Sequence, residues 1–156
     1  MKKAIARTLF AGVAVLNVGV LAAASVRAAK PNGPDVVSYP VPSLQWKEVP
    51  DSSGIKYANV QGDLLGNGYY EAFVIFPAGR DNPFHTHGKD LPTVVLKGTF
   101  YAVVNGKRTE YPAGSYYMLP GNLKHYSGCK AGEDCLLFQW QADHFDLNEM
   151  KDDSKR

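Results

Sequence analysis

Only two cysteines occur in the 156-residue sequence, and the motifs of the common nucleophilic enzymes are missing. Five residues lie between Cys129 and Cys135, so the pair does not form the Cys-x-x-Cys motif of thiol oxidoreductases and many zinc sites. No serine stands in a Gly-x-Ser-x-Gly nucleophile elbow. The sequence therefore does not indicate a hydrolase of the serine or cysteine type.

Long apolar runs are also absent, apart from one at the N-terminus. Three basic residues within the first seven positions precede an apolar run over residues 9–24, and a Val-Arg-Ala step ends at Ala28. This layout is typical of a secretory signal peptide. Glycines and an asparagine interrupt the run, which is shorter than the roughly 20 apolar residues of a membrane span. We predict a signal peptide over residues 1–28 and a periplasmic or secreted protein; an uncleaved anchor is the alternative.

The predicted mature chain has no excess of positive charge. Residues 1–28 contain four of the 17 Lys and Arg residues and none of the 15 Asp and Glu residues, so the remaining 128 residues have a formal charge of −2. A chain of this length is typical of one domain. The absence of a basic stripe argues against a nucleic acid partner, and the absence of a second apolar span argues against a membrane partner.

Helical periodicity is missing as well. Short segments rich in β-branched and aromatic residues alternate with Gly, Pro, Asn and Asp, a pattern that predicts an all-β sandwich or barrel. We predict strands over residues 55–61, 69–76, 93–96, 99–104, 107–111, 115–119 and 135–141. Asn67-Gly68 and Asn105-Gly106 are predicted to form tight hairpin turns, because both residue types tolerate positive φ values.

The strand pattern divides the mature chain into three parts. Residues 29–54 contain several prolines and are predicted to be an extended lead-in. Residues 55–145 form the predicted β domain. Residues 146–156 are highly charged, and we expect a frayed tail or a surface helix there.

After export, the two cysteines would enter an oxidising compartment. A nearby pair usually becomes a disulfide there, and residues 130–134 between Cys129 and Cys135 are typical of a hairpin loop. Closing so short a loop stabilises a fold by roughly 2 kcal/mol in the chain-entropy treatment. Zinc binding or redox catalysis by the pair remains the minor alternative.

The histidines carry the strongest chemical signal. His85 and His87 are two residues apart, so in a strand their side chains point to the same face and could bind one ion. A His-x-His pair alone is equally typical of two exposed histidines in a polar loop.

The spacing around the histidines is much more specific. Gly79 is followed after five residues by His85-Thr86-His87 and after ten more by Gly98. A second series contains Gly114, Pro120-Gly121 and His125 at five-residue and three-residue intervals. These two series resemble the two motifs of the cupin superfamily. The resemblance implies a jelly-roll β-barrel in which His85, His87 and His125 hold one metal ion.

Two departures from the cupin pattern bear on the predicted site. The usual acidic ligand of the first motif falls on Leu91, and the usual glycine of the second motif falls on Asn122. Asp90 lies next to the vacant ligand position, although adjacent strand residues face opposite sides. Three neutral nitrogens suit Fe(II), which we favour, and also Zn(II), Mn(II), Ni(II) or Cu(II). Gln139 and Gln141, on one face of the last strand, are candidates to line the cavity.

The resemblance leaves two functional hypotheses open. Some cupins with three histidines and no acidic ligand are Fe(II) dioxygenases that cleave diketones or oxidise small thiols, which implies a metal-dependent enzyme acting on a small organic molecule. Leu91 would favour an apolar substrate. The step Gly62-Asp63, the run Pro77-Ala78-Gly79 and residues 96–100 are similar to those of anti-sigma-type and diketone-cleaving cupins. The alternative to an enzyme is a non-catalytic module that binds or senses a metal or small ligand. Cupins often form dimers, so a homodimer is also expected. The sequence assigns no catalytic residue beyond the three histidines.

Overall fold

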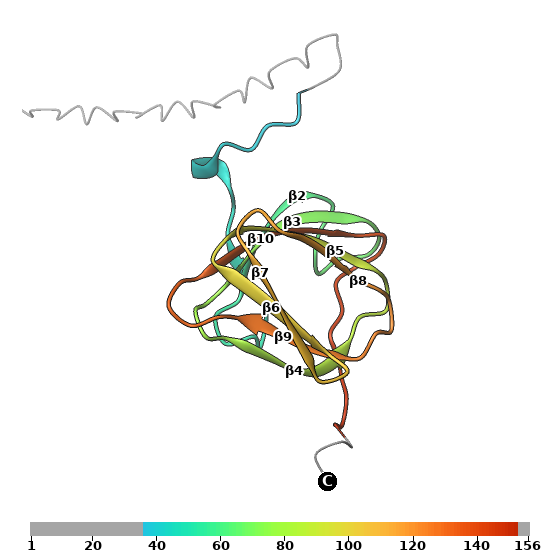
Figure 1. Ribbon diagram of the computed structural model, residues 1–156. Coiled ribbons are helices and arrows are strands. Elements are labelled where there is room, and N and C mark those ends of the chain that lie inside the picture. Colours follow the sequence, from blue (N-terminus) through green and yellow to red (C-terminus); the bar gives the residue numbers. More distant parts are fainter. Residues whose placement is uncertain (1–35, 153–156) are drawn as a thin grey trace, which may run out of the picture. The chain divides into compact units, whose positions relative to one another are not determined.

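The structure, a computed structural model, describes residues 36–152 (Figure 1). The predicted signal peptide, residues 1–28, lies outside the described residues. A six-stranded antiparallel sheet has the order β1-β2-β3-β10-β5-β8. Its strands are β1 (Lys47–Glu48), β2 (Lys56–Gln61), β3 (Tyr70–Phe76), β10 (Cys135–Gln141), β5 (Leu91–Lys97) and β8 (Tyr116–Leu119).

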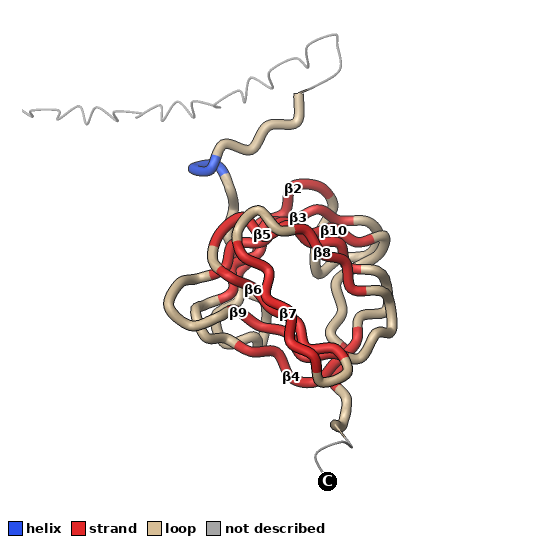
Figure 2. The backbone as a smooth tube through the Cα atoms, in the orientation of Figure 1, coloured by secondary structure: helices blue, strands red, loops and turns tan. Residues whose placement is uncertain are grey.

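A five-stranded sheet has the order β11-β4-β9-β6-β7. It contains β11 (Asn148–Glu149), β4 (Asp81–Thr86), β9 (His125–Cys129), β6 (Thr99–Val104) and β7 (Lys107–Pro112). The one helical element among the described residues is the 3-10 turn η1 (Val41–Ser43). Figure 2 shows β3, β10, β5 and β8 above the interior and β4 and β9 below it. The predicted all-β jelly-roll barrel is therefore confirmed.

Alternation along the strands creates the interior. In β3, the buried residues Tyr70, Ala72, Val74 and Phe76 alternate with half-buried ones, and β10 has the same pattern. Successive side chains of a strand point to opposite faces, so one half of each strand lines the core. The inward face of β10 changes along its length from apolar Cys135 and Leu137 to the two glutamines. Along β10, the inward face is therefore apolar near the disulfide and polar near the glutamines.

The seven predicted strands correspond to β2, β3, β5, β6, β7, β8 and β10. The sequence patterns did not predict β4 or β9. Pro83 in β4 and Gly128 in β9 have low strand propensity. These two strands therefore form because they pair with neighbouring strands, and not because of their local sequence. The two strands without a sequence signal are the ones that contain His85 and His125.

The two predicted hairpin turns have different outcomes. Asn105 and Gly106 have φ values of 50° and 76° and join β6 directly to β7, as a two-residue turn requires. At the other position only Gly68 has a positive φ, and the connection between β2 and β3 covers residues 62–69. The prediction of a tight turn at Asn67-Gly68 is therefore wrong.

The C-terminal residues are more ordered than a frayed tail. Asn148 pairs with Thr86 and Glu149 pairs with His85, so β11 forms the edge strand next to β4. The backbone N–H of Met150 also donates to the carbonyl oxygen of Phe84 at 2.8 Å. Because these pairings extend β4, the C-terminal segment supports the strand that carries the first histidine.

Cys129 and Cys135 form a disulfide that closes the loop between β9 and β10. Within residues 36–152, no helix has the length and apolar character needed to cross a membrane.

Candidate metal centre

Strand pairing brings the two histidine motifs together. His85 in β4 lies directly opposite His125 in β9, and the centroids of their rings are 4.1 Å apart. His87 is the first residue after β4. It lies on the same face as His85 because the two histidines are two positions apart in extended chain. One potential ligand atom from each residue lies within 4.8 Å of the others, and all three side chains are buried. The structure thus assembles the histidines that the sequence pattern singled out.

The loop before β9 closes over the loop after β4. The backbone N–H of Asn122 donates to the carbonyl oxygen of His87 at 2.7 Å. Asn122 has a φ of 63°, a left-handed conformation that asparagine tolerates, so it can replace the usual glycine of the motif. A Cβ at Gly121 would lie 3.1 Å from the carbonyl oxygen of Gly88. The shifted glycine therefore allows the close approach of the two loops.

Backbone carbonyls fix the orientation of all three rings. Nδ1 of His85 donates to the carbonyl oxygen of Pro83 at 2.7 Å, and Nδ1 of His125 donates to that of Leu123 at 2.9 Å. Nδ1 of His87 donates to the carbonyl oxygen of Asp146. With the proton on Nδ1, each Nε2 has a lone pair available for a metal, which is the usual arrangement of metal-binding histidines.

The Nε2 atoms have no adequate protein partner. Nε2 of His85 and Nε2 of His87 are 3.2 Å apart, but two lone pairs cannot form a hydrogen bond with each other. Nε2 of His125 is buried and has no hydrogen-bond partner within the described residues. Buried polar atoms are normally satisfied, so a cation among the three nitrogens is the simplest way to complete the group.

Burial also keeps the rings neutral. Desolvation first, and the neighbouring histidines second, lower the pKa of His85 from 6.5 to about 3. Burial lowers the pKa of His87 and of His125 as well. Metal ligation needs neutral imidazole, so the three residues fit a divalent transition metal. The donor set would accept Fe(II), Zn(II), Mn(II), Ni(II) or Cu(II).

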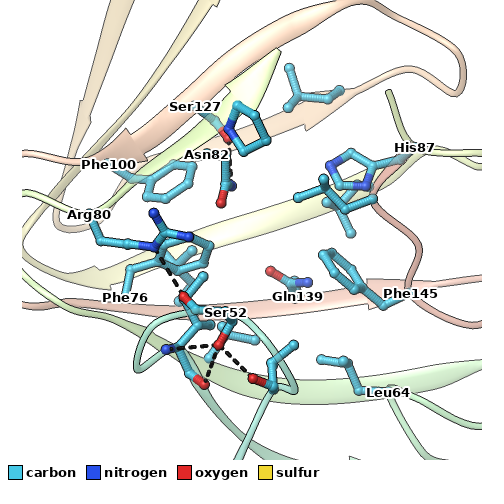
Figure 3. Close-up of a pocket in the computed structure, with 18 of the residues that line it drawn as sticks. Ser52, Leu64, Phe76, Arg80, Asn82, His87, Phe100, Ser127, Gln139 and Phe145 are labelled. Carbon is cyan, nitrogen blue, oxygen red and sulfur yellow. Dashed lines mark hydrogen bonds between the residues drawn. The ribbon is translucent and has the colours of Figure 1, made fainter. Parts of the chain in front are cut away.

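A largely apolar cavity of about 260 Å³ adjoins this cluster. His87 forms part of its wall, and Figure 3 shows the His87 ring beside Phe145 at one side of the space. The wall is mostly aliphatic and aromatic, with a few polar groups. Such a combination is typical of small-molecule sites.

Comparison with protein families identifies this arrangement. The family model of the cupin domain matches residues 72–140. Residues 72–140 therefore form a cupin domain. A comparison with curated proteins finds no significant match.

Solved cupin structures share the fold at low sequence identity. The polyketide cyclase RemF from Streptomyces resistomycificus has a TM-score of 0.63 and 12% identity, over 75% of this chain and 87% of that chain. An RmlC-like cupin from Ralstonia eutropha has a TM-score of 0.60 and 18% identity, over 78% and 74% of the two chains. The complex of SigE with the anti-sigma ChrR from Rhodobacter sphaeroides contains a chain with a TM-score of 0.51 and 20% identity, over 65% and 50% of the two chains.

This cupin has no carboxylate at the position of the acidic ligand. Leu91 is buried there and forms part of the cavity wall. The neighbouring Asp90 accepts a hydrogen bond from the backbone N–H of Gly121 at 2.8 Å, so it stabilises the loop contact instead of facing the histidines. His144, the fourth histidine, is exposed and contacts Asp143 at 3.0 Å.

The two glutamines of β10 differ in their surroundings. Gln139 lines the cavity, and its Nε2 donates to the hydroxyl of Tyr70 at 3.2 Å. Nε2 of Gln141 donates to the carbonyl oxygen of Lys89 at 3.1 Å, while its buried Oε1 has no hydrogen-bond partner among residues 36–152. Only Gln139 therefore lines the cavity beside His87.

Sequence reasoning missed Asp146, which holds His87 from the C-terminal segment. Besides the backbone contact to His87, its carboxylate accepts hydrogen bonds from the backbone N–H of Gly88 at 3.0 and 2.9 Å and from Nδ2 of Asn148 at 2.6 Å. No motif marks this residue, because the contact depends on the pairing of β11 with β4. Asp146 is a positioning residue for the cluster.

Asp146→Ala should weaken metal binding without preventing folding. Loss of the carboxylate removes the hydrogen bonds to Gly88 and Asn148, so the backbone carbonyl of Asp146 that orients His87 is held less firmly. Contacts that support a metal ligand are typically worth about tenfold or more in metal affinity. Competitive titration with a chromogenic chelator measures the change, and Asp143→Ala is the matched control. Equal affinities in the wild type and Asp146→Ala would contradict this role.

The metal-free protein should lose stability as the pH falls below 6.5, the ordinary histidine pKa. Because the folded-state pKa of His85 is lowered to about 3, the unfolded chain binds more protons between these values, and the free energy of unfolding decreases throughout that window. The slope is at most about 1.4 kcal/mol per pH unit for each such histidine. Urea unfolding in the presence of a chelator measures it. A His85→Gln variant should show a smaller slope, and an equal or larger slope in that variant would refute the assignment.

Proposed function

We propose that this cupin is an exported metal-dependent enzyme, of the Fe(II) dioxygenase type, that acts on a small and largely apolar organic molecule. The observation that carries the proposal is that His87 belongs both to the three-histidine cluster and to the cavity wall. A molecule in the cavity would therefore lie against the bound metal. A buried metal site that served stability alone would have no need of an adjoining cavity.

The residues around the cluster suit this role. Leu91 has no ligand atom, so a metal held by the three histidines would keep coordination positions for other ligands, and the side chain adds apolar surface to the cavity wall. The bound metal would supply Lewis-acid activation of the substrate and a means of using dioxygen. Gln139 lines the same cavity, and its bond to Tyr70 fixes the amide as a polar contact for the substrate. Burial raises the pKa of Tyr70, so its hydroxyl stays protonated.

Export is part of the proposal. The disulfide between Cys129 and Cys135 is of a kind that persists in oxidising compartments. The pattern of residues 1–28 supports the same location, the periplasm or the extracellular space.

A non-catalytic binding or sensing module is the second candidate. The structural similarity to a chain of the SigE–ChrR complex favours it, since that complex contains a regulatory protein. The polyketide cyclase among the similar structures favours an enzyme. The two candidates differ in whether a bound small molecule is converted.

Metal analysis followed by oxygen uptake tests the proposal. The mature chain, purified without chelators, should contain nearly stoichiometric iron that is lost in His85→Ala and His125→Ala but kept in His144→Ala, whose imidazole is exposed. The iron-loaded protein should consume oxygen with a member of a panel of diketones, thiols and phenols. Bound metal with ligand binding but no conversion would favour the sensing module. Failure to bind any divalent metal would contradict the metal-dependent enzyme.

A further inference from the structure

The cavity beside His87 has a cation on its opposite side. Arg80, directly before β4, lines the cavity, and Figure 3 shows Arg80 and His87 on opposite sides of the space. Nε of Arg80 donates to the carbonyl oxygen of Ser52 at 3.0 Å. This bond anchors the guanidinium while its remaining N–H groups stay available, because a guanidinium carries several donors in a fixed plane.

Within residues 36–152, no carboxylate forms an ion pair with the Arg80 guanidinium. The ion pairs of this part of the chain join exposed residues at other places. Asp51 and Glu149 also line the cavity, but both are exposed, which places them where the cavity meets solvent. A half-buried cation beside an apolar wall is best satisfied by an anion that enters with a ligand.

The space between the two ends is apolar, with few polar contacts. Phe76, Phe100 and Phe145 contribute rings to the wall. Nδ2 of Asn82 donates to Oγ of Ser127 at 3.0 Å, and Figure 3 shows the Asn82 amide oxygen directed into the space near Arg80. One guanidinium matches one negative charge, whereas the Asn82 amide oxygen is an acceptor that suits a hydrogen-bond donor on the ligand. A second negative charge on the ligand would lie against aromatic rings at a large desolvation cost.

We propose that the cavity selects small monocarboxylic acids with an aryl or branched alkyl body, and that Arg80 binds the carboxylate. The opposite end of the molecule then faces His87. This inference rests on the proposed function and names the substrate class of the same site. Bidentate pairing with a carboxylate is the interaction for which a guanidinium is best suited.

Calorimetric titration of the purified mature protein tests the inference with two probe pairs, phenylacetate with phenylacetamide and isovalerate with isovaleramide. The wild type should bind each acid about tenfold or more tightly than its amide, the range expected for a hydrogen bond between charged groups. Arg80→Gln should bind acid and amide equally, and Arg80→Lys should keep part of the preference. Lys97→Gln removes an exposed charge paired with Glu133 and should behave like the wild type.

The outcomes separate this inference from the proposed function. Absence of binding by all four probes, or an acid preference that survives in Arg80→Gln, would overturn the inference. An acid preference that disappears in His125→Ala but persists in Arg80→Gln would also overturn it, because the carboxylate would then bind at the metal. An Arg80-dependent preference in a protein that shows no oxygen uptake would support the inference while the proposed dioxygenase fails.

Discussion

The structure depends on burying three imidazoles whose Nε2 atoms face one another. A buried polar atom without a hydrogen bond lowers the free energy of unfolding by about 1–3 kcal/mol. His85, His87 and His125 are buried together, and Nε2 of His125 has no partner within residues 36–152. Backbone carbonyls hold all three Nδ1 atoms, so the rings cannot turn to find other partners. The resulting arrangement favours a cation over protons, since burial lowers the pKa of each ring.

Much of the surrounding fold serves this arrangement. β4 and β9 have weak strand propensity, and the register that pairs His85 with His125 is maintained by β11 on one side and β6 on the other. The loop contact between Asn122 and His87 joins the two motifs. Mainly apolar side chains line the cavity between the histidine cluster and Arg80, so the cavity suits a ligand with an apolar body.

The strands of the barrel were predicted from short-range alternation, and the histidine cluster from the resemblance to the cupin motifs, which implies the distant pairing of His85 with His125. Alternation gave seven strands, and motif spacing gave the three histidines. The parts that were not predicted depend on contacts between distant residues. Asp146 reaches His87 only because the C-terminal segment pairs with β4, and Arg80 lines the cavity only because the barrel curves around it. The turn expected at Asn67-Gly68 was wrong because the loop there is longer than the dipeptide suggested.

X-ray absorption at the edge of the bound metal, recorded on the purified protein, tests the central claim most directly. The account predicts a first coordination shell with three imidazole nitrogens, from His85, His87 and His125, completed by oxygen donors and free of sulfur. Multiple-scattering features of three imidazoles in the wild type, together with loss of the bound metal in His125→Ala, would match it. A shell with fewer than three imidazoles, or one that is unchanged in that variant, would contradict it.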